Sequence, residues 1–317
     1  MTNSRAELAY KLLGARGIGP KAASKILCDL LSEPFENAGA LTEKHHAILR
    51  HHLSGSQIDT VLAADRRLRA QIDDVLIDGG EFVTVLDDNY PQRLRHILAD
   101  ETPPVLGYFG NASLFEETSV GFCGSRRASE KGIRTAEDCV EQIVESGFVV
   151  VSGNAAGIDL AAHKRALECG GRTIFVLPEG LLRFRVKKEL KDVWDWERVL
   201  IVSEFQPGQT WNAHQAMTRN KTIIGLSDIL VAIEAGRTGG TIAAGQEALQ
   251  LRLPVFAPVY EGMPPEAEGN DILVSKGARP LRRSKSTGRA SLAAVIDELV
   301  SISKRRLHPP RQLGFGI

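Results

Sequence analysis

The sequence lacks long apolar runs and clustered cysteines. None of its apolar stretches approaches the roughly 18 residues of a membrane helix, and its first residues have no apolar segment of the kind found in secretory signal peptides. Its four cysteines lie far apart and form no CxxC pair. These absences predict a cytoplasmic protein with no membrane partner, no disulfide framework and no metal site.

A surplus of charge of either sign is also missing. Lys and Arg together number 39, as do Asp and Glu, so the formal net charge is zero. A protein coated with cations for nucleic acid would show a strong positive balance. Any site for a polyanion must therefore be a local patch. The share of hydrophobic residues, 43%, and of charged residues, 25%, is typical of a globular protein.

Residues 1–80 predict a small helical domain of the SAM-like kind, because apolar residues such as Leu8 and Leu12 recur at helical spacing. Within it, residues 14–27 hold a Gly-Ile-Gly turn followed by Pro20. Glycine tolerates positive φ and proline suits the first helical position, so this pattern joins two helices in a tight hairpin. The spacing resembles the helix-hairpin-helix element, whose turn amides can meet a DNA phosphate. A scaffold hairpin that touches no nucleic acid explains it equally well.

Beyond residue 80 the pattern becomes mixed. Residues 81–117 hold two short strands around an Asp-Asn-Tyr-Pro turn and a Pro-Pro break, and we expect a connector packed on the next domain. Residues 118–280 alternate short Val- and Ile-rich strands with helices, which predicts a Rossmann-like α/β domain with a parallel sheet and helices on both faces. Residues 281–317 predict a basic linker, one amphipathic helix and a tail. The strands expected in the Rossmann-like domain are 119–123, 148–152, 172–177, 199–205, 228–234 and 253–259.

Three of these strands end in glycine-rich turns. In an open parallel sheet ligands bind at the carboxyl ends of the strands, and backbone amides at helix starts bind anions. We therefore expect the turns to converge on one concavity for phosphate groups, and glycines that merely permit tight turns are the alternative interpretation. A GxGxxG fingerprint with a later acidic residue is missing, so no dinucleotide cofactor, and no other cofactor, is expected. The candidate phosphate-binding residues are Gly124, Ser125 and Arg126; Ser152, Gly153 and Asn154; and Thr238, Gly239, Gly240 and Thr241.

Two basic segments follow later strands and should border the same edge of the sheet. The first holds five cations within residues 183–191, and the second is Arg219-Asn220-Lys221. A solvated surface accounts for such runs as well as DNA binding does. Aromatic residues lie among the cations and could stack bases of a single strand, though packing is the better interpretation for Trp194 and Trp196. The candidates here are Arg185, Lys187, Arg219 and Asn220, with Phe184 and Trp211 beside them.

The order of these motifs resembles the DprA (Smf) family of DNA-processing proteins. The resemblance implies a Rossmann-like domain that binds single-stranded DNA without catalysis, forms a homodimer and loads a RecA-type recombinase onto the strand in natural transformation. It also implies that Arg126 and the amides of Gly124 and Ser125 grip phosphates, while Arg219, Asn220, Gly239 and Gly240 shape the pocket. The matching motifs are GIGPKAASKIL, Asp-Asn-Tyr-Pro, Gly-Ser-Arg, SGNAAGIDLAAH, Ser-Glu-Phe, Arg-Asn before IIGLSD, Glu234-Ala235 and Gly269-Asn270.

Several positions depart from this family. Asn154 and Ala156 stand where members usually have Leu and Arg, and Lys131 stands where many have Tyr. Arg185-Val186 replaces a Tyr-Pro, the last turn is Thr-Gly-Gly-Thr rather than Ser-Gly-Ser, and we expect no C-terminal winged helix within residues 281–317. These departures indicate a divergent member, such as a paralogue on a mobile element or in a defence locus.

Two alternatives use the same pocket. One is an enzyme, because residues 237–247 echo the PGGxGTxxE signature of LOG-type nucleotide phosphoribohydrolases, with Glu247 as the candidate acid or base. Glu247 lies later after the glycines than that motif requires, so we expect no catalytic residue. The other is a non-catalytic nucleotide sensor. Asp159 and His163 lie one helical turn apart, and we favour a structural role for the histidine.

Overall fold

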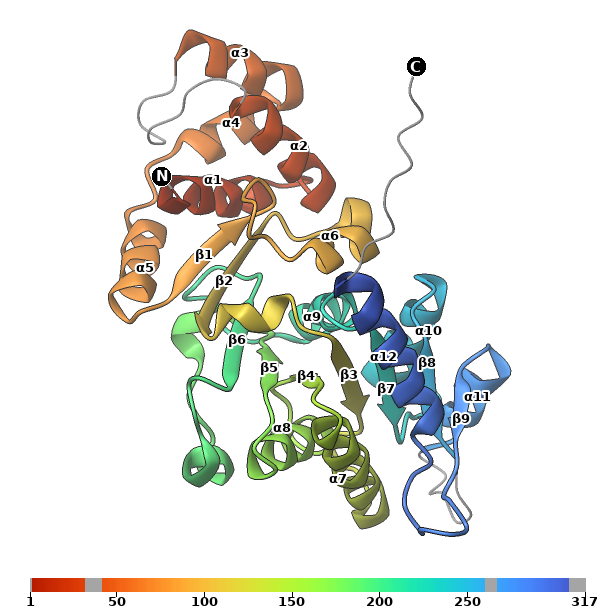
Figure 1. The fold of residues 1–317 in the computed structure, drawn as a ribbon. Coiled ribbons are helices and arrows are strands. Elements are labelled where there is room, and N and C mark those ends of the chain that lie inside the picture. Colours follow the sequence, from red (N-terminus) through yellow and green to blue (C-terminus); the bar gives the residue numbers. More distant parts are fainter. Residues whose placement is uncertain (1, 32–41, 260–266, 308–317) are drawn as a thin grey trace. The chain divides into compact units, whose positions relative to one another are not determined.

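The computed structural model describes residues 2–31, 42–259 and 267–307. Within them the chain folds as two compact units (Figure 1). Unit 1 comprises residues up to 116 together with 174–226, and unit 2 comprises 117–173 together with the residues from 227 onward. None of the helices in the described ranges is long and apolar enough to cross a lipid bilayer.

Unit 1 begins with a cluster of short helices, followed by strands. Gly17, at φ +85°, lies in the turn between the first two helices, and Pro20 is the first residue of the second. The strands have the order β1-β2-β6-β5, and β2 runs antiparallel to both β1 and β6. The elements are α1 (Thr2–Gly14), α2 (Pro20–Leu31), α3 (Glu43–His52), α4 (Gly55–Leu62), α5 (Arg66–Ile77), β1 (Glu81–Thr84), α6 (Gln92–Leu98), β2 (Val105–Gly110), β5 (Thr173–Val176), β6 (Val199–Ser203) and α9 (Ala213–Gly225). Short 3-10 helices cover Ala99–Glu101, Ala112–Phe115, Leu181–Arg183 and Lys188–Val193.

The Asp-Asn-Tyr-Pro turn of unit 1 has a clear packing role. Tyr90 is fully buried, and its hydroxyl donates a hydrogen bond of 2.6 Å to the carbonyl oxygen of Pro103. A buried phenol needs such a partner, because an unsatisfied hydroxyl in the core costs about 1–3 kcal/mol. The turn and the Pro-Pro break are therefore joined by one buried hydrogen bond.

Unit 2 carries five neighbouring strands of the sheet, in the order β4-β3-β7-β8-β9, and these neighbours are parallel. The prediction of an α/β fold with parallel strands is confirmed, because each expected strand of this unit is present within one or two residues of its expected ends. The elements are β3 (Ser119–Gly124), α7 (Glu130–Glu145), β4 (Val149–Gly153), α8 (Ile158–Glu168), β7 (Ile229–Ile233), α10 (Gly240–Gln250), β8 (Val255–Pro258), α11 (Gly269–Ser275), β9 (Arg279–Leu281) and α12 (Ala293–Leu307).

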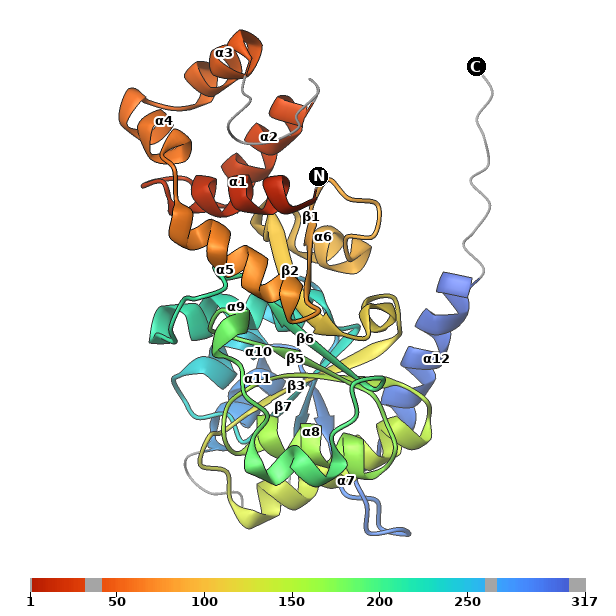
Figure 2. The same ribbon diagram turned by 90° about the vertical axis from the view of Figure 1, so that its left-hand side faces the viewer.

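Helices cover both faces of the unit 2 sheet. α7 and α8 lie side by side in both ribbon views (Figure 1, Figure 2) and share one apolar core with α12. Val120 and Phe122 of β3 point into that core. Because successive side chains of a strand alternate between faces, Leu230 and Ala232 of β7 point the other way, where α10 packs.

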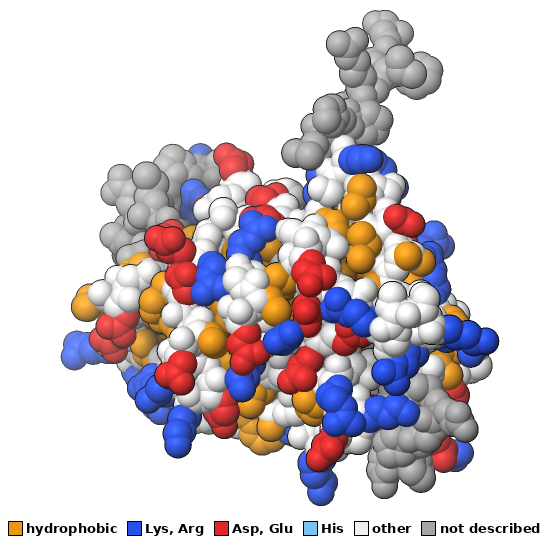
Figure 3. Space-filling model, turned by 60° about the horizontal axis from the view of Figure 1, so that its bottom comes forward, with side chains coloured by type: hydrophobic (Ala, Val, Ile, Leu, Met, Phe, Trp, Pro, Cys, Tyr) orange, Lys and Arg blue, Asp and Glu red, His pale blue; other side chains and the backbone are white. Residues whose placement is uncertain are grey.

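Side-chain charge is mixed at the surface. On the face drawn in Figure 3, Lys and Arg side chains are interspersed with Asp and Glu. This distribution agrees with the zero net charge and shows no coat of one sign on that face. A phosphate site therefore depends on local geometry, above all on the strand ends of unit 2.

Candidate phosphate-binding site

The order in which strands are added to the sheet of unit 2 changes sides at β3 and β7. β3 is followed in sequence by β4 on one side, whereas β7 lies hydrogen-bonded on the other side of β3. The crevice at such a reversal, at the carboxyl ends of the strands, is the usual ligand site of open α/β sheets. Two of the three predicted turns leave the sheet at this point.

Within unit 2 the first turn contacts the second turn and the end of β7, the strand that the third turn follows. The amide of Ile158, after the second turn, donates to the Ser125 carbonyl at 3.2 Å, and the amide of Ser125 donates to the Ile233 carbonyl at 3.3 Å. Gly157 has φ +75°, and a Cβ there would lie 2.3 Å from the Ser125 carbonyl oxygen. A Cβ on Gly124 would lie 2.6 Å from the Ile233 carbonyl oxygen. The glycines are required because backbone packs directly on backbone.

A carboxylate already occupies the start of α7. Glu234 is only 4% exposed and has φ +51°, and its carboxylate accepts hydrogen bonds from the amide of Ser129 at 2.7 Å and from the Ser129 hydroxyl. Ser129 in turn caps α7 by accepting from the Gly132 amide at 3.0 Å. A Cβ on Gly132 would lie 2.3 Å from the Glu234 carboxyl carbon. The favourable anion position at this helix start is therefore filled by the protein itself.

Sequence reasoning identified Glu234 only as a strand end and as part of a family motif. Its role was missed because the contact with Ser129 joins residues 105 positions apart. The exposed Arg126 and its neighbouring amides precede α7, outside the position that Glu234 fills.

The second turn is held from beneath by buried polar groups. Ser152 is fully buried, and its hydroxyl donates to the Phe122 carbonyl at 2.8 Å. The ring of His163 lies 2.7 Å from the Gly153 carbonyl, to which Nε2 donates, and its Nδ1 lies 2.7 Å from the Thr173 hydroxyl. These bonds give His163 a structural role and place the predicted Ser152 hydroxyl in the interior. Gly153 is buried as well, and of the three predicted residues in this turn only Asn154 is partly exposed.

The third turn is anchored by a buried amide side chain. Asn270 accepts from the Ala235 amide at 2.8 Å and donates to the Pro258 carbonyl at 2.9 Å, so it links the ends of β7 and β8. Thr238 and Gly239 are exposed beyond this anchor, and Gly239 precedes α10 with φ +104°. Gly240 and Thr241 then open α10 with their amides at its positive end.

Glu247, the candidate catalytic residue of the enzyme alternative, lies within α10. It follows Gly240 by seven residues, so it is about 10 Å along the helix axis at 1.5 Å per residue. Its side chain is partly buried. The backbone of Glu247 is therefore separated from the turn by about two turns of helix.

The remaining predicted residues belong to unit 1. Arg219 is 4% exposed, and its guanidinium donates to the Val176 carbonyl at the end of β5 at 2.9 Å, so it supports this strand end from inside. Arg185 is exposed and donates to the Phe184 carbonyl at 2.6 Å. Lys187 and Asn220 are partly exposed.

Unit 1 also holds a buried carboxyl and an aromatic cluster. The Thr222 hydroxyl donates to Glu204 at 2.6 Å, and burial raises the pKa of the Glu204 carboxyl above its ordinary value. The Trp194 ring packs 5.4 Å from Phe175, as expected for a packing residue. The rings of Trp196 and Trp211 are about half exposed. Trp196 is therefore more exposed than expected for a packing residue.

Comparison with known proteins gives consistent results. The family model of DNA recombination-mediator protein A matches residues 81–289. The DNA processing protein DprA of Streptococcus pneumoniae is 33% identical over 201 residues, which cover 62% of this chain and 69% of that protein. The X-ray structure of the Streptococcus pneumoniae protein superposes with a TM-score of 0.72 and 28% identity, over 89% of this chain and 95% of that chain. DprA of Helicobacter pylori, whose single-stranded DNA binding mode is described, shares the fold with a TM-score of 0.57 and 23% identity, over 70% of this chain and 97% of that chain.

Proposed function

Because the chain belongs to the family of DNA recombination-mediator protein A, we propose that it binds single-stranded DNA at the three turns of unit 2. The observation that carries the proposal is the packing of the turn at Ser125 against the turn at Gly157 and against the end of β7 at Ile233. This packing gathers backbone amides and the exposed Arg126 at the reversal point of the sheet. Amides and arginine are the groups that bind phosphates.

The residues that support this site are Gly124, Ser125, Arg126, Asn154, Thr238, Gly239, Gly240 and Thr241. Ser152 and Gly153 contribute by fixing the second turn from the interior. Of the predicted residues in unit 1, Arg185, Lys187 and Asn220 are at least partly exposed and are proposed as additional contacts to the strand, whereas Arg219 shapes a strand end.

The proposed binding involves no chemical step. Two carboxylates near the turns are hydrogen-bonded to backbone amides: Glu234 accepts from the Ser129 amide, and Asp159 accepts from the Ala155 amide at 3.2 Å. Glu247 is two helical turns from the glycines. Amides and an arginine can hold a phosphodiester, but they supply neither a nucleophile nor a general base.

We also propose the partners that the family resemblance implies: a homodimer that loads a RecA-type recombinase onto the strand during DNA uptake. The test is filament formation by such a recombinase on single-stranded DNA, with and without this protein. Faster filament formation supports loading, and an unchanged rate contradicts it without affecting DNA binding.

The binding proposal is tested with labelled oligonucleotides by fluorescence anisotropy. Wild-type protein should bind a single strand more tightly than the corresponding duplex, and Arg126→Ala should lose most of the single-strand affinity. Arg305→Ala is the matched control, because Arg305 is an exposed arginine of unit 2 on α12. A wild-type protein that binds no single strand at low salt would refute the proposal.

A further inference from the structure

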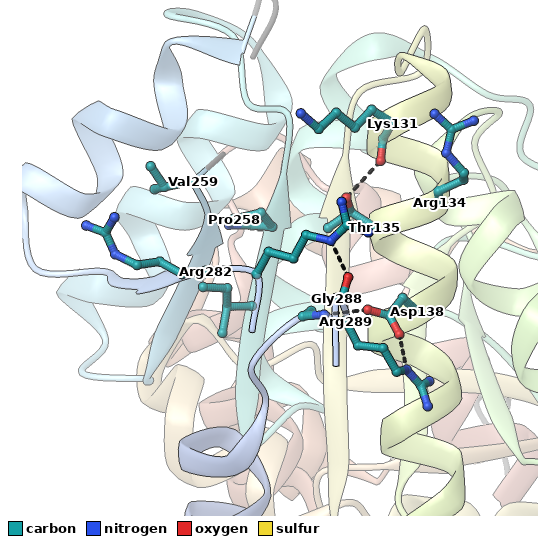
Figure 4. A pocket seen from close by; sticks show the side chains of 12 residues that line it. Lys131, Arg134, Thr135, Asp138, Pro258, Val259, Arg282, Gly288 and Arg289 are labelled. Carbon is teal, nitrogen blue, oxygen red and sulfur yellow. Dashed lines mark hydrogen bonds and ion pairs between the residues drawn. The ribbon is translucent and has the colours of Figure 1, made fainter. Parts of the chain in front are cut away.

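A basic cavity lies in unit 2, outside the three turns. It has a volume of about 310 Å³ and opens between α7, the carboxyl ends of β8 and β9, and the segment that follows β9 (Figure 4). Its apolar lining comes from Pro258, Val259, Leu281 and Ala290. Its cationic lining comes from Lys131, Arg134, Arg282, Arg283 and Arg289.

The wall after β9 is a short hairpin fixed to α7. Arg283 and Ala290 form an antiparallel bridge, and Arg283 donates to the Gly288 carbonyl. Asp138 of α7 accepts from the Ala290 amide at 2.6 Å and from the Arg289 guanidinium at 2.5 Å. The basic segment predicted as a linker is therefore a positioned part of the fold.

The cavity has an excess of positive charge. Asp138 is the one carboxylate among the described residues that line it, and this carboxylate is bound by Arg289. Lys131 and Arg134 on the α7 side and Arg282 on the hairpin side add further cations (Figure 4). Arg134 also pairs with Glu130 at 3.3 Å, but both of those side chains are exposed, so the pair is worth little. The cavity is therefore suited to an anion.

The presence of both cationic and apolar side chains in the lining indicates which kind of anion fits the cavity. A bare phosphate would use the cations but leave the apolar surface empty. A nucleotide uses both, since its phosphate pairs with Lys and Arg while its base lies on apolar side chains. The volume is at the lower end of the range for small-ligand sites, which is about 300–1,000 Å³.

The position along α7 connects this cavity to the turns. Lys131 and Arg134 follow the helix cap Ser129 by two and five residues, which is about 3 Å and 8 Å of helix rise. A strand held at Arg126 and running along α7 would reach the cavity within a few nucleotides, because stacked nucleotides are spaced by about 3.4 Å.

We propose that this cavity binds one nucleotide unit of the same DNA strand whose backbone is held at the turn of Arg126. The proposal rests on the proposed function. It also assigns a role to Lys131.

The test compares Lys131→Gln/Arg282→Gln with Lys276→Gln/Arg305→Gln. Both double variants remove two exposed positive charges from unit 2. They differ in position, because the first pair lines the cavity and the second pair lies outside it. Anisotropy is measured on strands of about 4 and about 16 nucleotides, the limits of typical single-strand sites. A parallel calorimetric titration uses deoxythymidine monophosphate.

The cavity variant should bind both strands on the order of tenfold more weakly than wild type, because the cavity lies within a few nucleotides of the turn at Arg126. Its slope of log affinity against log salt should be shallower by about 0.7 for each lost phosphate contact, a change that a purely structural role would not produce. The control variant should show neither effect.

Other outcomes overturn the proposal. If Arg126→Ala loses the strand but the cavity variant binds like its control, the cavity inference fails and the proposed function stands. If the cavity variant loses the mononucleotide but keeps the strand, the cavity is a site for a free nucleotide instead. If wild type binds no strand at all, both proposals fail.

Discussion

Replacement of Gly157 by alanine should separate the first two turns of the site. A side chain at φ +75° and ψ −125° is strained by about 1–3 kcal/mol. The new Cβ would also lie 2.3 Å from the Ser125 carbonyl oxygen, so the Ser125 backbone must move. That movement would weaken the hydrogen bond from the Ile158 amide to the Ser125 carbonyl, which contributes about 1 kcal/mol. The free energy of unfolding should therefore fall by about 2–4 kcal/mol, and affinity for single-stranded DNA should fall with it.

Gly170→Ala is the matched control. Gly170 has nearly the same φ, +74°, but a Cβ there meets nothing within 4 Å. It should cost only the conformational penalty of about 1–2 kcal/mol and leave DNA affinity unchanged. Urea unfolding should be followed by circular dichroism, because the three tryptophans lie in unit 1 and Gly157 lies in unit 2. Equal losses of stability and unchanged DNA affinity in both variants would refute the argument that the turns depend on this backbone contact.

Three further substitutions test individual contacts. Glu234→Gln should lower stability, because Ser129 loses a charged acceptor. It should raise DNA affinity two- to fivefold, because the removed negative charge at the helix start competes with a bound anion by about 0.3–1 kcal/mol. Unchanged affinity in an anisotropy titration would contradict this prediction. Burial raises the pKa of Glu204 above 4.5, so its protonated form stabilises the fold, and this stability is lost as pH rises from the unfolded pKa through the folded one. Glu204→Gln keeps an acceptor for Thr222 and should remove that loss, as urea unfolding at acid and neutral pH would show; an unchanged pH dependence contradicts it. Glu247→Gln should leave DNA affinity unchanged, and wild type should release no free base from AMP; release of base that the variant abolishes would favour the enzyme alternative.

The strands and their turns could be predicted from sequence because each depends on local signals. The segment 148–152, for example, is a Val-rich run that ends at glycine, and the structure contains β4 at Val149–Gly153. That the turns leave the sheet at the carboxyl ends of its strands followed from the general rule for parallel sheets. These turns could be recognised without a GxGxxG fingerprint, because their glycines allow close backbone contacts.

The direction of side chains could not be predicted. Ser152 and Arg219 are polar residues in glycine-rich or basic segments, yet both bond to buried backbone carbonyls. Glu234 fills the start of α7 through a contact with a residue far away in sequence. The hairpin at 283–290 has no hydrophobic periodicity, and the contact with Asp138 that fixes it also spans a long stretch of chain. Such partners are set by tertiary packing alone.

The central claim is that Arg126 and the three turns hold DNA phosphates. The most direct test is the salt dependence of single-strand binding by wild type, Arg126→Ala and Arg305→Ala. The slope of log affinity against log salt should be shallower by about 0.7 for Arg126→Ala, the loss of one phosphate contact, and unchanged for Arg305→Ala. Identical slopes and affinities for all three proteins would contradict the account.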